Sequence, residues 1–191
     1  YAPFDGEKIS GSGTDIMPGE PYDSPLSPMG GAEQLAWSPD GMKIAYTCKK
    51  KTGAQAAVST DADIYIYDIV SKQTQNLTEG NKGYDMNPAW SPDGRFIAWT
   101  SMEEDGYEAD KNDIKLYEWS TGKTYNLTAR WDETIEEFAW ERTSDKIIFR
   151  TTLNAVEQLF EYRLPKTLAA IDPHTSIVQL TKGDDCKGAF I

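Results

Sequence analysis

Basic residues and long hydrophobic runs are scarce in this sequence. Its 191 residues include 19 lysines and arginines against 31 aspartates and glutamates, which gives a formal net charge of -12. Proteins that bind nucleic acids gather basic side chains on one face, and the one basic run here, residues 49–51, is too short for that role. No apolar stretch approaches the ~20 residues that cross a bilayer, and the first ten residues lack the pattern of a signal peptide. The sequence therefore predicts no nucleic-acid partner and no membrane span.

Histidine and cysteine are nearly absent. The one histidine, His174, lies in the loop-like stretch IDPHTS, which disfavours Ser-His-Asp catalysis and most zinc sites. Cys48 and Cys186 are far apart and form no CxxC or Cys/His grouping. We interpret them as buried free thiols, with a disulfide between them as the alternative. The sequence predicts no metal site and no cofactor.

A nucleophile elbow is also missing. The G-x-S-x-G motif needs glycines on both sides of the serine to permit its strained turn, and no serine here has them at both positions. The nearest imitation, SGSGT at residues 10–14, has the wrong spacing. We therefore expect this chain to contain no catalytic residue of its own.

What the sequence does contain is an internal repeat. WSPDGMKIAY, which begins at Trp37, returns as WSPDGRFIAW at Trp90, and Trp140 begins a third copy that keeps the length but loses the SPDG letters. Each copy is followed by a second matching stretch (DIYIYD, DIKLYE and QLFEYR) and then by a third (NLTEG, NLTAR and QLTKG). The period is about fifty residues, in the range of solenoid and propeller repeats.

Each unit contains four short strand signals separated by turn residues. In the first unit these are the stretch that ends at Trp37, then KIAYT, DIYIYDI and TQNLT. They are enriched in β-branched and aromatic residues, and helical periodicity is nearly absent. Four antiparallel strands in each of several consecutive repeats are the signature of propeller blades. We therefore predict an all-β fold, a partial β-propeller of about three four-stranded antiparallel blades of ~50 residues.

The repeat register also sets the expected boundaries. Residues 32–80, 81–130 and 131–183 are the three blades, and residues 184–191 begin the link to a next blade. Residues 1–31 are the remnant of a preceding blade with a linker, in which KISGSGTDIMPGE resembles a last strand with Ile16 in the position of Leu77. Three blades cannot close a ring whose usual minimum is four. We therefore interpret the chain as a fragment of a larger propeller, whose open blade edges favour self-association.

Two repeated motifs suggest chemistry, and the repeat itself explains both. In SPDG, proline fixes φ, aspartate accepts a backbone hydrogen bond and glycine takes a positive φ. Asp40 and Asp93 are therefore interpreted as turn residues rather than as catalytic or metal-binding carboxylates. NLT at 76–78 and 126–128 matches the glycosylation pattern, but repeat geometry accounts for it equally well, with modification as the alternative.

The repeat, and above all the tract GYDMNPAWSPDGRFIAWTSMEEDGYEADK, resembles the amino-terminal propeller of prolyl oligopeptidase family serine peptidases, of the bacterial dipeptidyl or acylaminoacyl peptidase type. The likeness runs from about residue 17 onward. It implies further blades and a carboxy-terminal α/β-hydrolase domain that carries a serine, an aspartate and a histidine. No part of that domain is expected within these residues. A periplasmic or secreted location is favoured over a cytoplasmic one, but the compartment itself is not readable from these residues.

The resemblance implies a role and candidate residues. In that family the propeller restricts access to the active site, and in dipeptidyl peptidases its acidic residues hold the amino terminus of the peptide substrate. The candidates for amine recognition, or for docking against the hydrolase domain, are Glu103, Glu104, Glu108, Glu136 and Glu137. The first three lie in an acidic loop, residues 103–110, whose alternatives are a solvated surface loop and a calcium site.

Two classes of function stay open. The favoured one is a non-catalytic propeller that gates and orients peptides for a hydrolase domain, so that the parent chain is an enzyme and this fragment is not. The alternative is a TolB-type propeller that binds a protein partner without enzymatic activity. A propeller with its own active site is disfavoured by the single histidine. Substrate preference, total blade number and oligomeric state cannot be read from these residues.

Overall fold

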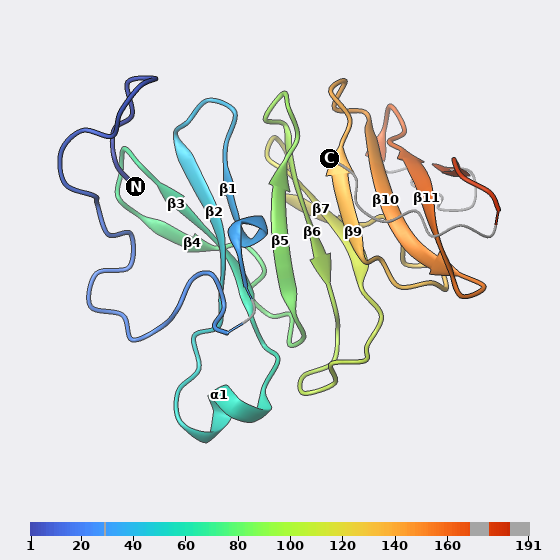
Figure 1. The fold of residues 1–191 in the computed structure, drawn as a ribbon, viewed down its shortest axis with the longest axis horizontal. Helices are drawn as coiled ribbons and strands as arrows, with labels where there is room; N and C mark the ends of the chain where they lie inside the picture. The colour runs from blue at the N-terminus through green and yellow to red at the C-terminus, as the bar shows by residue number, and fades with distance from the viewer. Residues whose placement is uncertain (29, 169–175, 184–191) are drawn as a thin grey trace.

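The computed structural model describes residues 1–28, 30–168 and 176–183, and this part of the chain is nearly all β (Figure 1). The first sheet consists of β1 (Leu35–Trp37), β2 (Lys43–Cys48), β3 (Asp63–Asp68) and β4 (Thr74–Asn76). The second consists of β5 (Asp85–Trp90), β6 (Phe96–Ser101), β7 (Asp113–Glu118) and β8 (Lys123–Asn126). The third consists of β9 (Glu137–Trp140), β10 (Lys146–Leu153), β11 (Val156–Arg163) and β12 (Ile177–Gln179). Each sheet is an antiparallel meander in chain order, so the predicted three four-stranded blades are confirmed.

The three sheets lie side by side, with their first strands next to one another. β5 contacts both β1 and β9, as innermost strands do around a propeller axis. A short 3-10 helix, η1 (Ala32–Gln34), leads into β1, and a short helix, α1 (Ala54–Val58), lies between β2 and β3. Figure 1 shows α1 and the β6–β7 loop at one end of the sheets, and the β1–β2 and β5–β6 turns at the opposite end. The long loops therefore share the end at which one blade connects to the next.

The SPDG turns have the predicted geometry. In the first blade, Asp40 Oδ1 accepts hydrogen bonds from the Ser38 hydroxyl at 2.6 Å and from the Met42 amide at 3.0 Å, and Gly41 has φ +70°. The second blade repeats the arrangement with Gly94 at φ +72°. In the third copy Ser144 stands in the glycine position and still takes φ +62°, so the turn persists without its glycine.

Buried apolar side chains fill the space between neighbouring sheets. The cluster between the first and second sheets contains Ala45, Ile64, Ile66, Ile97 and Trp99. The cluster between the second and third sheets contains Phe96, Ala98, Ile114, Leu116, Ile147, Phe149, Phe160 and Tyr162, among others. Full burial of one large aliphatic or aromatic side chain stabilises a fold by roughly 1.5–3 kcal/mol. The regular spacing of these residues in the repeat therefore provides the cohesion between blades.

Residues 1–31 do not form the predicted last strand of a preceding blade. In the described part of this segment, pairing is limited to one isolated bridge between Phe4 and Ile9, and no strand forms around Ile16. Ile16 and Met17 lie in a bend that a turn with Gly19 at φ +79° follows directly, so the chain changes direction here instead of extending. Tyr1, Ile16, Met17 and Tyr22 instead pack on the face of the first sheet that points away from the second sheet.

Cys48 is a buried free thiol in the first sheet, and burial raises its pKa to about 11. Cys186 and His174 lie outside the described residues, so the interpretations placed on them stay predictions. Among the described residues, no helix is long and apolar enough to cross a membrane.

Candidate functional site

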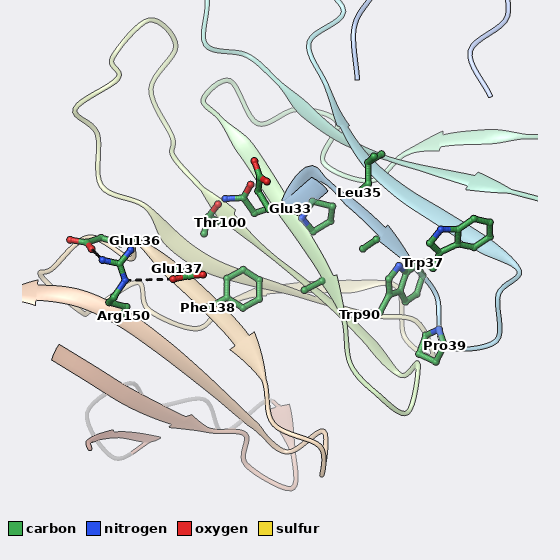
Figure 2. A pocket seen from close by; sticks show the side chains of 14 residues that line it. Glu33, Leu35, Trp37, Pro39, Trp90, Thr100, Glu136, Glu137, Phe138 and Arg150 are labelled. Atoms are coloured by element: carbon green, nitrogen blue, oxygen red, sulfur yellow. Dashed lines mark ion pairs between the residues drawn. The ribbon is translucent and has the colours of Figure 1, made fainter. Parts of the chain in front are cut away.

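A cavity of about 660 Å³ opens between the first strands of the three sheets (Figure 2). One end carries polar side chains, and Figure 2 shows Glu136, Glu137 and Arg150 together there. The opposite end is apolar, with Trp37, Pro39 and Trp90 among its lining residues. The cavity therefore combines a charged end and an aromatic end.

The repeat explains how polar residues from separate blades reach one cavity. The positions four and three residues before the repeat tryptophans are Glu33 and Gln34, Met86 and Asn87, and Glu136 and Glu137. These positions lie where the innermost strands begin, at the end that also carries the long loops. Because innermost strands surround the propeller axis, side chains at equivalent positions converge on the same space. Glu33, Asn87, Glu136 and Glu137 all line the cavity.

Glu136 and Glu137 share one arginine. Arg150 Nη1 lies 2.8 Å from Glu136 Oε2, and Arg150 Nε lies 3.6 Å from Glu137 Oε2. Arg150 Nη1 also pairs with Glu157 at 2.5 Å. Three carboxylates around one guanidinium leave a local excess of negative charge. The Glu137 side chain is 45% exposed and the Glu136 side chain 26%, so both carboxylates can be reached from the cavity.

The acidic loop between β6 and β7 divides into structural and exposed carboxylates. Asp105 Oδ1 accepts hydrogen bonds from the Ser59 hydroxyl at 2.7 Å and the Thr60 amide at 2.8 Å, which ties the loop to the preceding blade. These bonds lower the pKa of Asp105. Asp110 Oδ2 accepts from the amides of Glu103 and Glu104 at 2.8 and 3.0 Å, which closes the loop on itself.

The side chains of Glu103, Glu104 and Glu108 are exposed and do not line the cavity. The structure therefore brings Glu136 and Glu137 to the cavity and leaves the other three candidates on a loop at the same end of the blades. No cluster of histidine, cysteine and carboxylate side chains suitable for a metal occurs among the described residues. The calcium alternative for this loop consequently has no ligand set in the described part of the chain.

The two NLT motifs perform a repeated structural task. In the second blade, the Asn126 amide donates to Asp113 Oδ2 at 2.8 Å, and the Thr128 hydroxyl donates to Asp113 Oδ1 at 2.8 Å. The Thr128 hydroxyl oxygen also accepts from the Ile114 amide at 2.9 Å. The first blade has the same arrangement, with Asn76 and Thr78 on Asp63. Each motif therefore fastens the outermost strand to the start of the third strand.

Four polar residues of the cavity are not among those predicted from the sequence: Glu33, Asn87, Thr100 and Arg150. Glu33 and Asn87 could have been found from the repeat register, because they stand in the positions equivalent to Glu136 and Glu137. Arg150 is the direct cross-strand neighbour of Glu137 in the β9–β10 pairing, so the strand register also contained its signal.

Fold and cavity together define the chain as consecutive blades of a β-propeller whose innermost strands surround an acidic cavity. No protein-family model matches the chain. Dipeptidyl-peptidase 5 of Porphyromonas gingivalis is 44% identical over 153 residues, a match that covers 80% of this chain and 22% of that protein. The chain is thus similar in sequence to one part of dipeptidyl-peptidase 5, and the predicted resemblance to peptidases of this kind is confirmed.

Solved structures agree on the fold. TolB from Acinetobacter baumannii superposes with a TM-score of 0.52 at 21% identity, covering 80% of this chain and 33% of that one. A puromycin-hydrolyzing peptidase from Mycobacterium tuberculosis superposes with a TM-score of 0.57 at 12% identity, covering 78% of this chain and 23% of that one. At these identities the likeness shows the propeller fold alone. The TolB structure and the peptidase structure superpose about equally well, so the fold does not distinguish between these two classes of protein. The sequence similarity to dipeptidyl-peptidase 5 favours the peptidase class.

Proposed function

We propose that this chain is the substrate-gating propeller portion of a serine peptidase, and that its cavity holds the free amino terminus of a peptide. The peptide is thereby oriented for an α/β-hydrolase domain elsewhere in the gene product, and the blades described here contribute no catalytic residue. The observation that supports this function best is the presence of Glu136 and Glu137 in the cavity with only one arginine between them.

The chemistry of the cavity suits an ammonium group. An ammonium ion offers three N–H donors, and ionised carboxylates are its strongest hydrogen-bond acceptors. Arg150 keeps Glu136 and Glu137 close together without neutralising both, so a second cation is attracted to them. Fixing the amino terminus at one point sets the distance to the bond that is cleaved, which is how a binding site selects exopeptidase products.

The exposed acids of the β6–β7 loop support a different part of the proposal. Glu103, Glu104 and Glu108 point to solvent from a loop that Asp105 holds against the preceding blade. A fixed loop with free carboxylates at the end that bears the cavity suits docking against a basic patch of the hydrolase domain. We assign these three residues to docking, and Glu136 and Glu137 to amine binding.

The test uses the complete gene product that carries this chain, with dipeptidyl substrates that have a free or an acetylated amino terminus. The double variant Glu136→Gln/Glu137→Gln keeps the side-chain shape and removes both charges. A charge-assisted hydrogen bond is worth roughly 1.5–3 kcal/mol, so KM for the free-amine substrate is expected to rise about tenfold or more. Turnover of the acetylated substrate, which has no ammonium group, is expected to be poor and unchanged by the variant.

The matched control is Glu7→Gln/Glu79→Gln, which removes the same charge from two exposed carboxylates that lie outside the cavity and outside the β6–β7 loop. It is expected to leave KM for the free-amine substrate unchanged. Equal effects of the two double variants would assign the result to net charge rather than to amine binding. A gene product with no G-x-S-x-G elbow and no peptidase activity would favour the TolB-type binding propeller instead.

A further inference from the structure

The innermost strand of the second blade is irregular where it lines the cavity. The pairing of β5 with β6 shifts register between Met86 and Ala89, which is a β-bulge. Within the bulge Asn87 has φ +57°, in the left-handed region that non-glycine residues rarely adopt. The corresponding pairings of β1 and β9 show no register shift. Bulges next to binding sites re-aim a side chain, and here the bulge places Asn87 in the cavity wall.

Two hydrogen bonds hold the residues that lead into this bulge. The Thr100 hydroxyl donates to the Met86 carbonyl at 3.1 Å, across the strand from the bulge. Asp85 precedes Met86 in the chain. Its Oδ1 atom accepts a hydrogen bond from Trp99 Nε1 at 2.8 Å, and the residue is 1% exposed. The conformation of Asn87 is therefore determined by fixed neighbours rather than by its own hydrogen bonds.

The Asn87 side chain makes no hydrogen bond within the part of the chain that the structure describes. The residues in the equivalent positions of the other blades are both engaged. Gln34 Oε1 accepts from the Leu26 amide at 2.7 Å, and Glu137 faces Arg150. Of the three equivalent side chains, Asn87 is thus the one whose donors and acceptor are available in the cavity.

We propose that Asn87 is a binding residue for the first peptide group of a peptide whose amino terminus lies at Glu136 and Glu137. This inference rests on the function proposed above and extends it from the ammonium group to the peptide backbone. A primary amide offers an N–H donor and a carbonyl acceptor, which match the carbonyl and the N–H of a peptide group. Glycine would adopt φ +57° more easily, but it would bring no hydrogen-bonding group to the cavity.

The test measures binding of alanyl-alanine amide to the complete gene product by isothermal titration calorimetry. Asn87→Gly removes the side chain and tolerates the positive φ, so the thermal midpoint is not expected to fall. A net hydrogen bond of roughly 0.5–1.5 kcal/mol corresponds to a Kd that rises about 3- to 10-fold in this variant. The matched control is Asn154→Gly, an exposed asparagine with φ +53° in the β10–β11 turn, for which Kd should not change.

A second probe isolates the peptide group. In the depsipeptide analogue an ester oxygen replaces the N–H of the first peptide bond, so Asn87→Gly is expected to weaken its binding less than it weakens binding of the amide. An equal loss for both probes would overturn the assignment of Asn87 to that N–H.

The Glu136→Gln/Glu137→Gln variant separates the two proposals. Weaker binding in this variant with no change in Asn87→Gly would overturn the Asn87 inference and leave amine binding standing. Weaker binding in Asn87→Gly alone would overturn amine binding and keep a role for Asn87. Absence of measurable binding to the unaltered protein would overturn both.

Discussion

Positive φ values at non-glycine residues mark two different situations in this chain. At Asn87 the left-handed conformation lies in the cavity wall, whereas at Asn154 and Ala155 it forms the two-residue turn between β10 and β11. The turn needs positive φ at both positions, which asparagine tolerates and alanine does not. The positive φ of Ala155 therefore lowers the stability of the fold without an evident role in function, and a substitution can remove this strain.

Replacing Ala155 with glycine is expected to stabilise the protein. Glycine relieves the left-handed strain of the turn, and after the loss of unfolded-state entropy the net gain is about 0.5–1 kcal/mol in the free energy of unfolding. Urea denaturation followed by circular dichroism measures this difference. The control is Ala129→Gly, an exposed loop alanine without a positive φ, which is expected to lose a few tenths of a kcal/mol. A loss in both variants would show that the turn is not strained.

At the scale of elements, the loops depend on contacts between blades. α1 precedes Ser59 and Thr60, and both residues donate hydrogen bonds to Asp105 in the loop of the next blade. The bonds favour the ionised carboxylate and lower its pKa below the ordinary value of about 3.9. A lowered folded-state pKa means that this contribution is fully present above about pH 4 and is lost as pH falls through the folded-state pKa.

We therefore expect the β6–β7 loop to detach in acid before the sheets unfold. Amide resonances of Thr60 and Gly106, followed by NMR from pH 6 downward, should shift together with an apparent pKa below 3.9, while strand amides stay unchanged. Asp105→Asn should give the detached resonances at neutral pH. Persistence of the native Thr60 resonance in that variant would contradict the role assigned to Asp105.

The sequence predicts those features that depend on local residue chemistry. It does not predict features that depend on contacts with another segment of the chain. The strands and the SPDG turns follow from residue alternation and turn residues, and both are present as predicted. The bulge at Asn87 cannot be read from the spacing of the repeat motifs, because its extra residue lies within β5 and does not change that spacing. The likeness of Ile16 to Leu77 predicts a strand around residue 16, but a strand also needs a neighbouring strand to pair with, and the sequence of one segment does not specify that partner.

At the scale of the whole molecule, apolar packing joins the blades. The repeat tryptophans can add to this contact, but their surroundings differ from blade to blade. Trp140 Nε1 donates to the Ala89 carbonyl of the preceding blade at 3.0 Å, and its ring stacks on Phe96 with centroids 6.2 Å apart. Trp37, in the equivalent position of the first blade, is 52% exposed and makes no indole hydrogen bond within the described residues. One tryptophan therefore links two blades, and the other faces the open side of the first.

This difference predicts unequal effects of the same substitution. Trp140→Phe keeps an aromatic ring against Phe96 but leaves the Ala89 carbonyl without its donor, which is expected to cost about 1 kcal/mol in the free energy of unfolding. Trp37→Phe removes no such bond and is expected to cost little, so the pair isolates the hydrogen bond between blades. Urea denaturation of the 191-residue chain measures both variants. Equal losses would show that the indole bond does not contribute to the contact, whereas a second unfolding transition in Trp140→Phe alone would show that it couples the third blade to the first two.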